Sequence, residues 1–375
     1  MASSTFFALN HTDNIDEQYA ALKKHCEQGA TIILELSLPR SHSTAWQIAL
    51  AQADNVDQLN EPSYHADWIC RPCDAAAPLP GTRPSSEYFR KINERLTELK
   101  KENPRPTLIV NDLSNALSLY ELNQMLKLTK NVCITMRDPI ANAHSLLTRF
   151  INDTLSAPGE KNISPEEALK LANTTAFTKQ QIIELIDSKK INPEHILLSA
   201  CLDKNAELTS EILVKAISNT VKIVSNDCFN ICWENLKKQL DLIRTFPDTK
   251  IIIINGDDLI KNPESIMEQS SKAFGLSYTS KMIDHWEKAT GDNFHCCVTA
   301  NMPQEYIKNN AWLGPVRNSS KIEKKDSGMP SGLTLESFPL AMHAAIREAQ
   351  KIFNEMTNSA ELLHIPESPA NVLRR

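Results

Sequence analysis

The sequence has no apolar run long enough to cross a bilayer. No window approaches the about eighteen consecutive apolar residues that a membrane-spanning helix needs. The N-terminus also lacks a basic segment followed by an apolar core and a cleavage site, and the chain holds no internal repeat or low-complexity tract. We therefore expect a cytoplasmic protein with no membrane span.

The chain also lacks an excess of positive charge. Its formal net charge is −6 over 375 residues, which gives no general attraction to nucleic acid or to anionic lipid. Hydrophobic residues make up 41% and charged residues 23%, enough apolar material for one large domain or two moderate ones. We expect no nucleic-acid partner.

The cysteines lack the rhythm of a disulfide scaffold. There are nine, an odd and scattered set that suits a reducing compartment. Cys70-Arg71-Pro72-Cys73 and the pair Cys296-Cys297 beside His295 could converge on zinc. Ligand spacing alone is weak evidence, so the preferred interpretation is free thiols and no metal site.

Short apolar runs separated by helix-like stretches predict a parallel α/β sheet of about five strands. The stretch Ile251 to Ile254 is almost continuously apolar, as in a strand covered on both faces. The expected strands are Thr31 to Leu36, Asn55 to Leu59, Thr107 to Val110, Val132 to Met136 and Lys250 to Ile254.

Helical periodicity dominates the stretch from Phe150 to Phe246. Ser164, with proline next and glutamate three positions on, forms a helix-start signal, and this helix is expected to run toward Ile186. This region serves either as scaffolding or as the wall of an acceptor pocket. Further helices are expected over Pro193 to Asn205, Thr209 to Asn219 and Asp227 to Phe246.

The division that follows is an N-terminal part of an α/β core over residues 1–149, a helical insertion or cap over 150–246, and a C-terminal part of the core over 247–375. In the last part, Asn262 is expected to cap a helix that Gly275 ends in the left-handed conformation. Asn309 to Leu333 is predicted as a loop and Glu336 to Leu363 as helical.

The segment Leu38 to Trp46 joins the first strand to a helix with residues suited to an anion. Backbone N–H groups at a helix start point at a bound phosphate, and Arg40 adds charge-assisted hydrogen bonds. Ser43 and Thr44 add hydroxyl donors. The alternative is a capped helix start with no ligand.

A second anion-binding element follows the fourth strand. Arg137 closes that strand, and Ser145 lies eight positions later in the next helix. With a rise of about 1.5 Å per residue, the two side chains can converge on one phosphate. A structural salt bridge between Arg137 and Asp138 is the alternative.

Together these elements resemble the sulfotransferases that use 3′-phosphoadenosine 5′-phosphosulfate. Pro39 to Trp46 is similar to the family's 5′-phosphosulfate loop, and Arg137-Asp138-Pro139 with Ser145 to its 3′-phosphate motif. Asp257 to Leu276 and, more weakly, Trp312 to Ser319 are similar to its later signatures. The resemblance implies a three-layer, P-loop-like fold with a helical insertion.

The resemblance also implies a function: transfer of a sulfuryl group to a hydroxyl or amine of a small-molecule or peptide acceptor, without a metal. Trp46 is expected to pack in the core rather than stack on adenine, and Lys321 and Lys324 join the late loop's charge. The donor would be bound by Arg40, Ser41, His42, Ser43, Thr44, Arg137, Ser145 and Arg317.

The chain departs from the family pattern at two positions. His42 stands where the family has glycine, so a left-handed backbone there must be carried by a histidine whose ring points away. The usual lysine at the end of the third strand is missing from Ile109 to Asp112, which leaves Arg40 or another group to stabilise the leaving phosphate.

Sulfuryl transfer needs a base close to the acceptor. Glu61 matches the glutamate-proline pattern of one family group and is favoured, because a glutamate in a partly buried cleft can have a raised pKa. Asp112, at the end of the third strand, is the second candidate and His65 a third.

Two other functions stay open. One is a catalytically degenerate nucleotide-binding or protein-interaction module with the same fold, in which His42 and the missing lysine have abolished transfer. The other is a P-loop phosphotransferase, disfavoured because the chain lacks Gly-x-x-x-x-Gly-Lys-Ser/Thr. A homo-oligomer is compatible with either.

Overall fold

The structure is a computed structural model that describes residues 15–63, 86–156, 163–200, 202–284, 286, 320–324 and 332–363. Several residues singled out above lie outside these ranges. They are the cysteine groupings at 70–73 and 295–297, the base candidate His65, and the late signature Trp312 to Ser319 with the predicted phosphate ligand Arg317.

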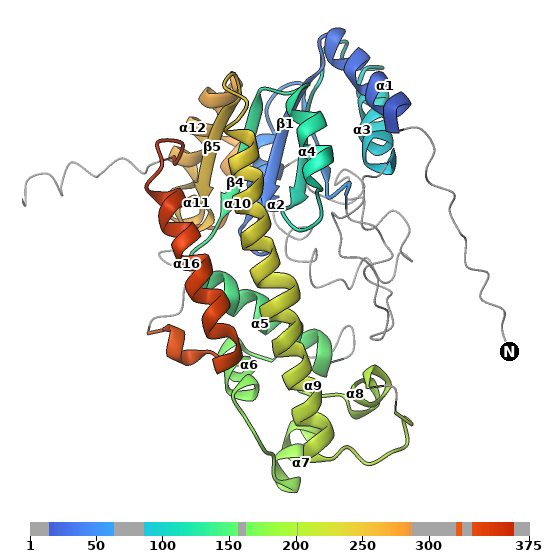
Figure 1. The fold of residues 1–375 in the computed structure, drawn as a ribbon, viewed down its shortest axis with the longest axis vertical. Coiled ribbons are helices and arrows are strands. Elements are labelled where there is room, and N and C mark those ends of the chain that lie inside the picture. The colour runs from blue at the N-terminus through green and yellow to red at the C-terminus, as the bar shows by residue number, and fades with distance from the viewer. Residues whose placement is uncertain are drawn as a thin grey trace, which may run out of the picture.

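A five-stranded, all-parallel sheet forms the centre of the molecule, in the order β2-β3-β1-β4-β5 (Figure 1). The predicted α/β class is confirmed, and each predicted strand matches an observed one to within a few residues. The strands are β1 (Thr31–Ser37), β2 (Val56–Asn60), β3 (Thr107–Leu113), β4 (Asn131–Met136) and β5 (Lys250–Asn255).

Helices cover both faces of the sheet, which explains why the strands are almost continuously apolar. On β1, Leu34 and Leu36 belong to one apolar cluster and Ile33 to the other. The first cluster is covered by α1 (Ile15–Glu27), α3 (Ser86–Leu99), α4 (Leu119–Leu126), α5 (Pro139–Leu155), α10 (Ile231–Ile243) and α16 (His343–Thr357). The second is covered by α2 (Ser43–Leu50), α11 (Gly256–Lys261), α12 (Pro263–Phe274) and α13 (Lys281–Asp284).

A helical extension projects away from the sheet (Figure 1). It contains α6 (Pro165–Ala172), α7 (Lys179–Asp187), α8 (Pro193–Ser199) and α9 (Ser210–Lys222). The helix expected from Ser164 to Ile186 was predicted too long. Asn173 and Thr174 bond the carbonyls four residues back and end α6, and Thr178 starts α7 with its own capping box.

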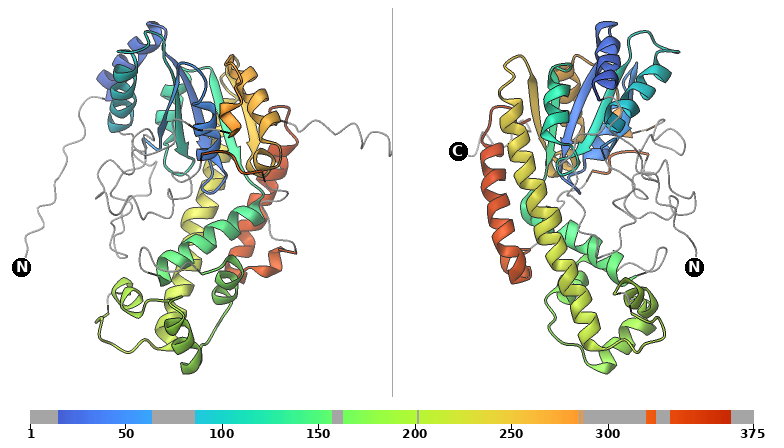
Figure 2. Two further views of the ribbon diagram at one scale, coloured as in Figure 1. Left: turned by 180° about the vertical axis from the view of Figure 1, so that it is seen from behind. Right: turned by 45° about the vertical axis from the view of Figure 1, so that its right-hand side comes forward.

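One long helical path joins the extension to the sheet (Figure 2). α9 continues through a π-helical turn, η2 (Ile223–Asn230), into α10 without leaving helical geometry. The prediction of two separate helices here was wrong. Ser225, in the π-helical turn, donates to the carbonyl of Ala341 at 3.0 Å, which fixes this turn against the segment that precedes α16.

The ends of α12 agree with the prediction in part. Gly275 adopts φ 69° and ends the helix in the left-handed conformation, as expected. Asn262 makes no side-chain capping hydrogen bond, so its predicted capping role is wrong and the helix begins at Pro263. Within the described ranges, no helix combines the length and the apolar character needed to cross a membrane.

Candidate functional site

The loop between β1 and α2 carries two residues in the left-handed region. Arg40 and His42 both have φ 66°, a conformation that costs a residue with a side chain about 1–2 kcal/mol. His42 precedes α2 at the position where the sulfotransferases have glycine, and it takes the left-handed conformation that the sequence required of it. This backbone therefore has to be held by its neighbours.

Hydrogen bonds from β4 and α5 hold the loop. The amide of Leu38 donates to the carbonyl of Thr135 on β4 at 3.2 Å. Asn142 on α5 donates to the carbonyl of Pro39 at 2.6 Å. Ser41 is 1% exposed, and its hydroxyl lies 3.2 Å from that of Thr135. Ser41 is thus turned into the sheet rather than toward a ligand.

Gly256, where β5 passes into α11, supports the loop from the other side. A Cβ atom at this glycine would lie 2.0 Å from the carbonyl oxygen of Ser41 and 3.2 Å from Cδ2 of His42. No real Cβ approaches a backbone oxygen so closely. The loop therefore occupies the space that any other residue at 256 would fill.

Three arginines gather beside the loop. The Nε atom of Arg40 donates to the Ser145 hydroxyl at 3.1 Å. Arg137 forms an ion pair with Asp257 at 2.9 Å, and Arg149 pairs with Asp153 one helical turn away. Burial, with Arg149 and then Arg137 nearby, lowers the pKa of the Arg40 guanidinium from its ordinary value. The cluster is cationic and partly desolvated.

The geometry rejects the alternative of an Arg137–Asp138 salt bridge and gives Ser145 a partner that the sequence did not assign to it. Arg137 pairs with Asp257 instead of Asp138, whose carboxylate accepts from the amides of Ile140 and Ala141 and caps α5. Ser145 bonds Arg40, which the sequence assigned to the other phosphate element. The two predicted phosphate subsites therefore meet at one point.

Arg149 was missed by the sequence analysis. It lies four residues after Ser145 on α5, so both side chains project from the same face of that helix. The four-residue spacing from Ser145 could have identified Arg149 as a neighbour of the candidate site. The sequence alone did not show that Arg40 lies beside this face of α5.

The remaining loop residues lie around the start of α2. Ser43 is 7% exposed in the first turn, with Thr44 next to it half-buried. Trp46 is completely buried, and its indole nitrogen donates to Ser270 on α12 at 3.1 Å. The prediction that Trp46 packs in the core is confirmed.

Glu61 and Asp112, the two base candidates, lie at the carboxyl ends of β2 and β3. Glu61 has φ 53°, and its amide donates to the carbonyl of Asn111 at 2.6 Å. Burial raises the pKa of Glu61 to about 7. Asp112 is completely buried, accepts from the amide of Ser63 at 3.0 Å, and has its pKa raised well above the ordinary value by burial.

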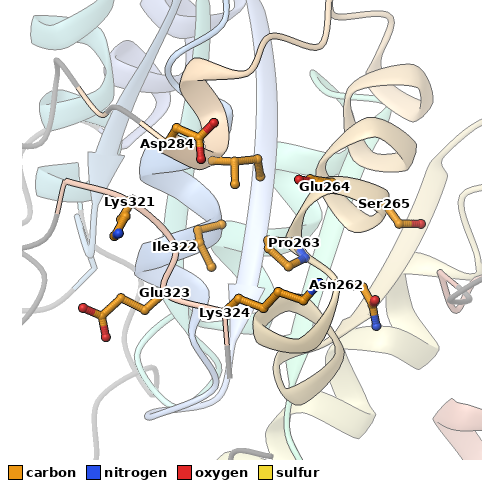
Figure 3. Close-up of a pocket in the computed structure, with 10 residues that line it drawn as sticks. Asn262, Pro263, Glu264, Ser265, Asp284, Lys321, Ile322, Glu323 and Lys324 are labelled. Atoms are coloured by element: carbon orange, nitrogen blue, oxygen red, sulfur yellow. The ribbon is translucent and has the colours of Figure 1, made fainter. Parts of the chain in front are cut away.

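A separate pocket of about 580 Å³ lies between the start of α12, α13 and residues 320–324 (Figure 3). Lys321 and Lys324, expected to add charge around the nucleotide, line this pocket together with Glu264 and Asp284. None of its lining residues belongs to the arginine cluster or to the loop. Within the described ranges, no group of three or more His, Cys, Asp or Glu side chains is arranged to hold a metal ion.

Comparison with known proteins gives no match to any protein-family model. Among curated proteins, a segment of 136 residues is 26% identical to protein phosphatase 1 regulatory subunit 3C of Clarias batrachus. The match covers 36% of this chain and 46% of the relative, so the chain spans about half the length of the protein it matches.

This comparison overturns the expected sulfotransferase activity. The matching protein is named as a regulatory subunit, which points to binding and regulation instead of sulfuryl transfer. The degenerate binding module that the sequence left open agrees better with the comparison.

We predict that Gly256→Ala destabilises the protein by about 1–3 kcal/mol, as an overpacked site does. The added methyl group would meet the Ser41 carbonyl, which is backbone and cannot rotate away. Gly332→Ala, where φ is positive and the space is open, measures the strain of a left-handed alanine without a clash, and Gly256→Ala should cost more than it does because its methyl group meets backbone. Urea unfolding of both variants measures which of them loses more free energy of unfolding. A Gly256→Ala variant as stable as the native chain would contradict the close approach.

We also predict that Glu61 makes stability fall as pH rises. Its pKa is raised from 4.5 in the unfolded chain to about 7 in the fold. Between these values the folded protein keeps a proton that the unfolded chain has released, so the free energy of unfolding decreases with pH. Glu61→Gln should flatten the slope between pH 4.5 and 7 relative to the native chain. The exposed Glu102→Gln should leave it unchanged, and equal slopes for both variants would refute the assignment.

Proposed function

We propose that this chain is a non-catalytic regulatory module that binds a phosphate group at the arginine cluster and a protein partner on the helical extension. The observation that carries the proposal is the hydrogen bond from Arg40 to Ser145. It joins two elements that a bisphosphorylated donor would need as separate subsites.

The charge of the cluster favours one anion. Burial, Arg149 and Arg137 all disfavour the charged form of the Arg40 guanidinium. The three guanidinium groups lie in a partly buried place, where repulsion between them is weakly screened. A phosphate accepting from Arg40 would relieve this repulsion through charge-assisted hydrogen bonds.

The surroundings give less support to an adenylyl ligand. Trp46 is engaged with Ser270 inside the second apolar cluster, so it offers no surface for a base. Asn111, near the missing lysine, accepts from Ser37 and donates to Asn60 at 3.0 Å each. A phosphate monoester or a free phosphate therefore suits the site better than a nucleotide.

Two observations support a protein-binding site on the helical extension: the name of the similar protein and a set of exposed apolar side chains. The relative's name attaches it to a phosphatase. Four large apolar side chains between α7 and the π-helical turn are 40–57% exposed, namely Ile183, Leu198, Leu202 and Ile223. Single exposed apolar residues are ordinary, and these four belong to different elements of the extension and of the π-helical turn that follows it, so they serve here as the positions at which docking is tested.

We predict that inorganic phosphate raises the melting temperature of the native chain in a saturable way, because a ligand at 100 times its Kd stabilises by about 2.7 kcal/mol. Arg149→Gln and Ser145→Ala should each raise the Kd for phosphate about tenfold, which corresponds to a loss of about 1.4 kcal/mol of binding free energy. Arg105→Gln, at an exposed position, is the control. Arg137 is left intact, since its removal would strand Asp257 without its partner.

Adenosine 3′,5′-bisphosphate tests the ligand class in the same assay. If the site holds a single phosphate, the nucleotide should bind within about tenfold of the affinity of phosphate, because the adenosine and the second phosphate would add no more than about 1.4 kcal/mol of binding free energy. Binding more than a hundredfold tighter would reject it. A native chain that no phosphate stabilises would reject the anion site altogether.

For the protein partner, the catalytic subunit of protein phosphatase 1 is the first probe. Leu198→Lys and Leu202→Lys should each reduce its affinity about tenfold or more, as expected for an apolar anchor worth over about 1.4 kcal/mol. Tyr278→Lys, at a 38% exposed position away from the extension, should have no effect. Equal affinity of all three variants would reject the extension as the docking surface, and no binding by the native chain would reject this partner.

A further inference from the structure

The carboxyl group of Glu35 lies in the middle of the sheet. Glu35 is completely buried on β1, opposite Asn111 on β3 and Cys133 on β4. Its Oε1 atom accepts from the Thr135 hydroxyl at 3.2 Å, and its Oε2 atom is buried without a hydrogen-bond partner. No ion pair involves it among the described residues. An apolar side chain would pack here without that unmet oxygen, so Glu35 contributes something other than packing.

The hydrogen bonds of Glu35 lead to the loop. Thr135 has one hydroxyl hydrogen, and it donates this hydrogen to Glu35. In the contact between Thr135 and Ser41, Ser41 must therefore be the donor. The relay runs from Ser41 through Thr135 to Glu35 and ends at a carboxyl oxygen. This direction follows from Glu35 Oε1 acting as the acceptor from Thr135.

Ser41 lies between the two left-handed residues of the loop. Its carbonyl rests against Gly256, and its hydroxyl is held by the relay. Both sides of one residue are thereby anchored while its neighbours, Arg40 and His42, keep φ 66°. From this backbone position Arg40 Nε donates to the Ser145 hydroxyl at 3.1 Å.

We propose that Glu35 is a positioning residue for the anion site. Through Thr135 and Ser41 it holds the backbone that directs Arg40 into the arginine cluster, without touching the anion itself. The proposal depends on phosphate binding at that cluster. Burial raises the pKa of the Glu35 carboxyl well above its ordinary value.

A double-mutant cycle on the full-length chain tests the relay, with inorganic phosphate as probe and titration calorimetry as readout. Glu35→Leu and Thr135→Val should each weaken phosphate binding about tenfold, the value of about one buried hydrogen bond. The double variant should be no weaker than either single variant, because both break one relay. Glu35→Gln keeps an acceptor oxygen and should restore the affinity to within about threefold.

Two further variants separate positioning from stability. Ser41→Ala cuts the relay at the loop by removing one buried hydroxyl and leaves Glu35 in place, so it should reproduce the loss of affinity even if Glu35→Leu fails to fold. Thr129→Val removes another buried threonine hydroxyl, which donates to the Ile32 carbonyl at the opposite end of the sheet. It should lower stability and leave phosphate affinity unchanged.

The outcomes distinguish this inference from the function on which it rests. If the native chain binds phosphate but the Glu35, Thr135 and Ser41 variants bind it equally well, the relay is refuted and the anion site stands. Additive losses in the double variant would also refute the relay. If the native chain binds no phosphate, both the proposed function and the inference fail.

Discussion

The structure around the candidate site depends on holding a left-handed backbone without glycine. Arg40 and His42 both carry side chains at φ 66°, and neighbouring elements compensate for the strain. Asn142 of α5 and Thr135 of β4 bind the loop, and Gly256 leaves room for it. The side chain of Arg40 is directed by this arrangement, so the arginine cluster depends on it as well.

The sheet was predictable because its strands are buried on both faces, which gives each a continuous apolar run bounded by polar residues. The loop was predictable in kind from its hydroxyl and cationic residues. The hydrogen-bond and ion-pair partners of these residues were not predictable. Whether Arg137 meets Asp138 or Asp257, 120 residues away, depends on how β5 is placed beside β4, and no local pattern contains that information.

Helix ends show the same limit in a smaller way. The apolar periodicity after Ser164 continues past Ala172, but Asn173 and Thr174 bond back to the preceding turn and stop the helix there. The prediction of function was wrong for a related reason. Motif residues can keep their places in the fold while their contacts change, as Ser41 does when its hydroxyl turns toward Thr135.

The continuous helix from α9 through η2 to α10 connects the helical extension rigidly to the sheet. At its inner end the carbonyl of Cys232 accepts from the hydroxyl of Ser114 at 2.8 Å, and the amide of Ser114 donates to the carbonyl of Ser37 at 2.8 Å. Ser37 is the last residue of β1, immediately before the loop that leads to α2. A displacement of the extension therefore has this path to the loop, with Ser225 fixed against the Ala341 carbonyl, and a second path through α5, whose Asn142 donates to the Pro39 carbonyl.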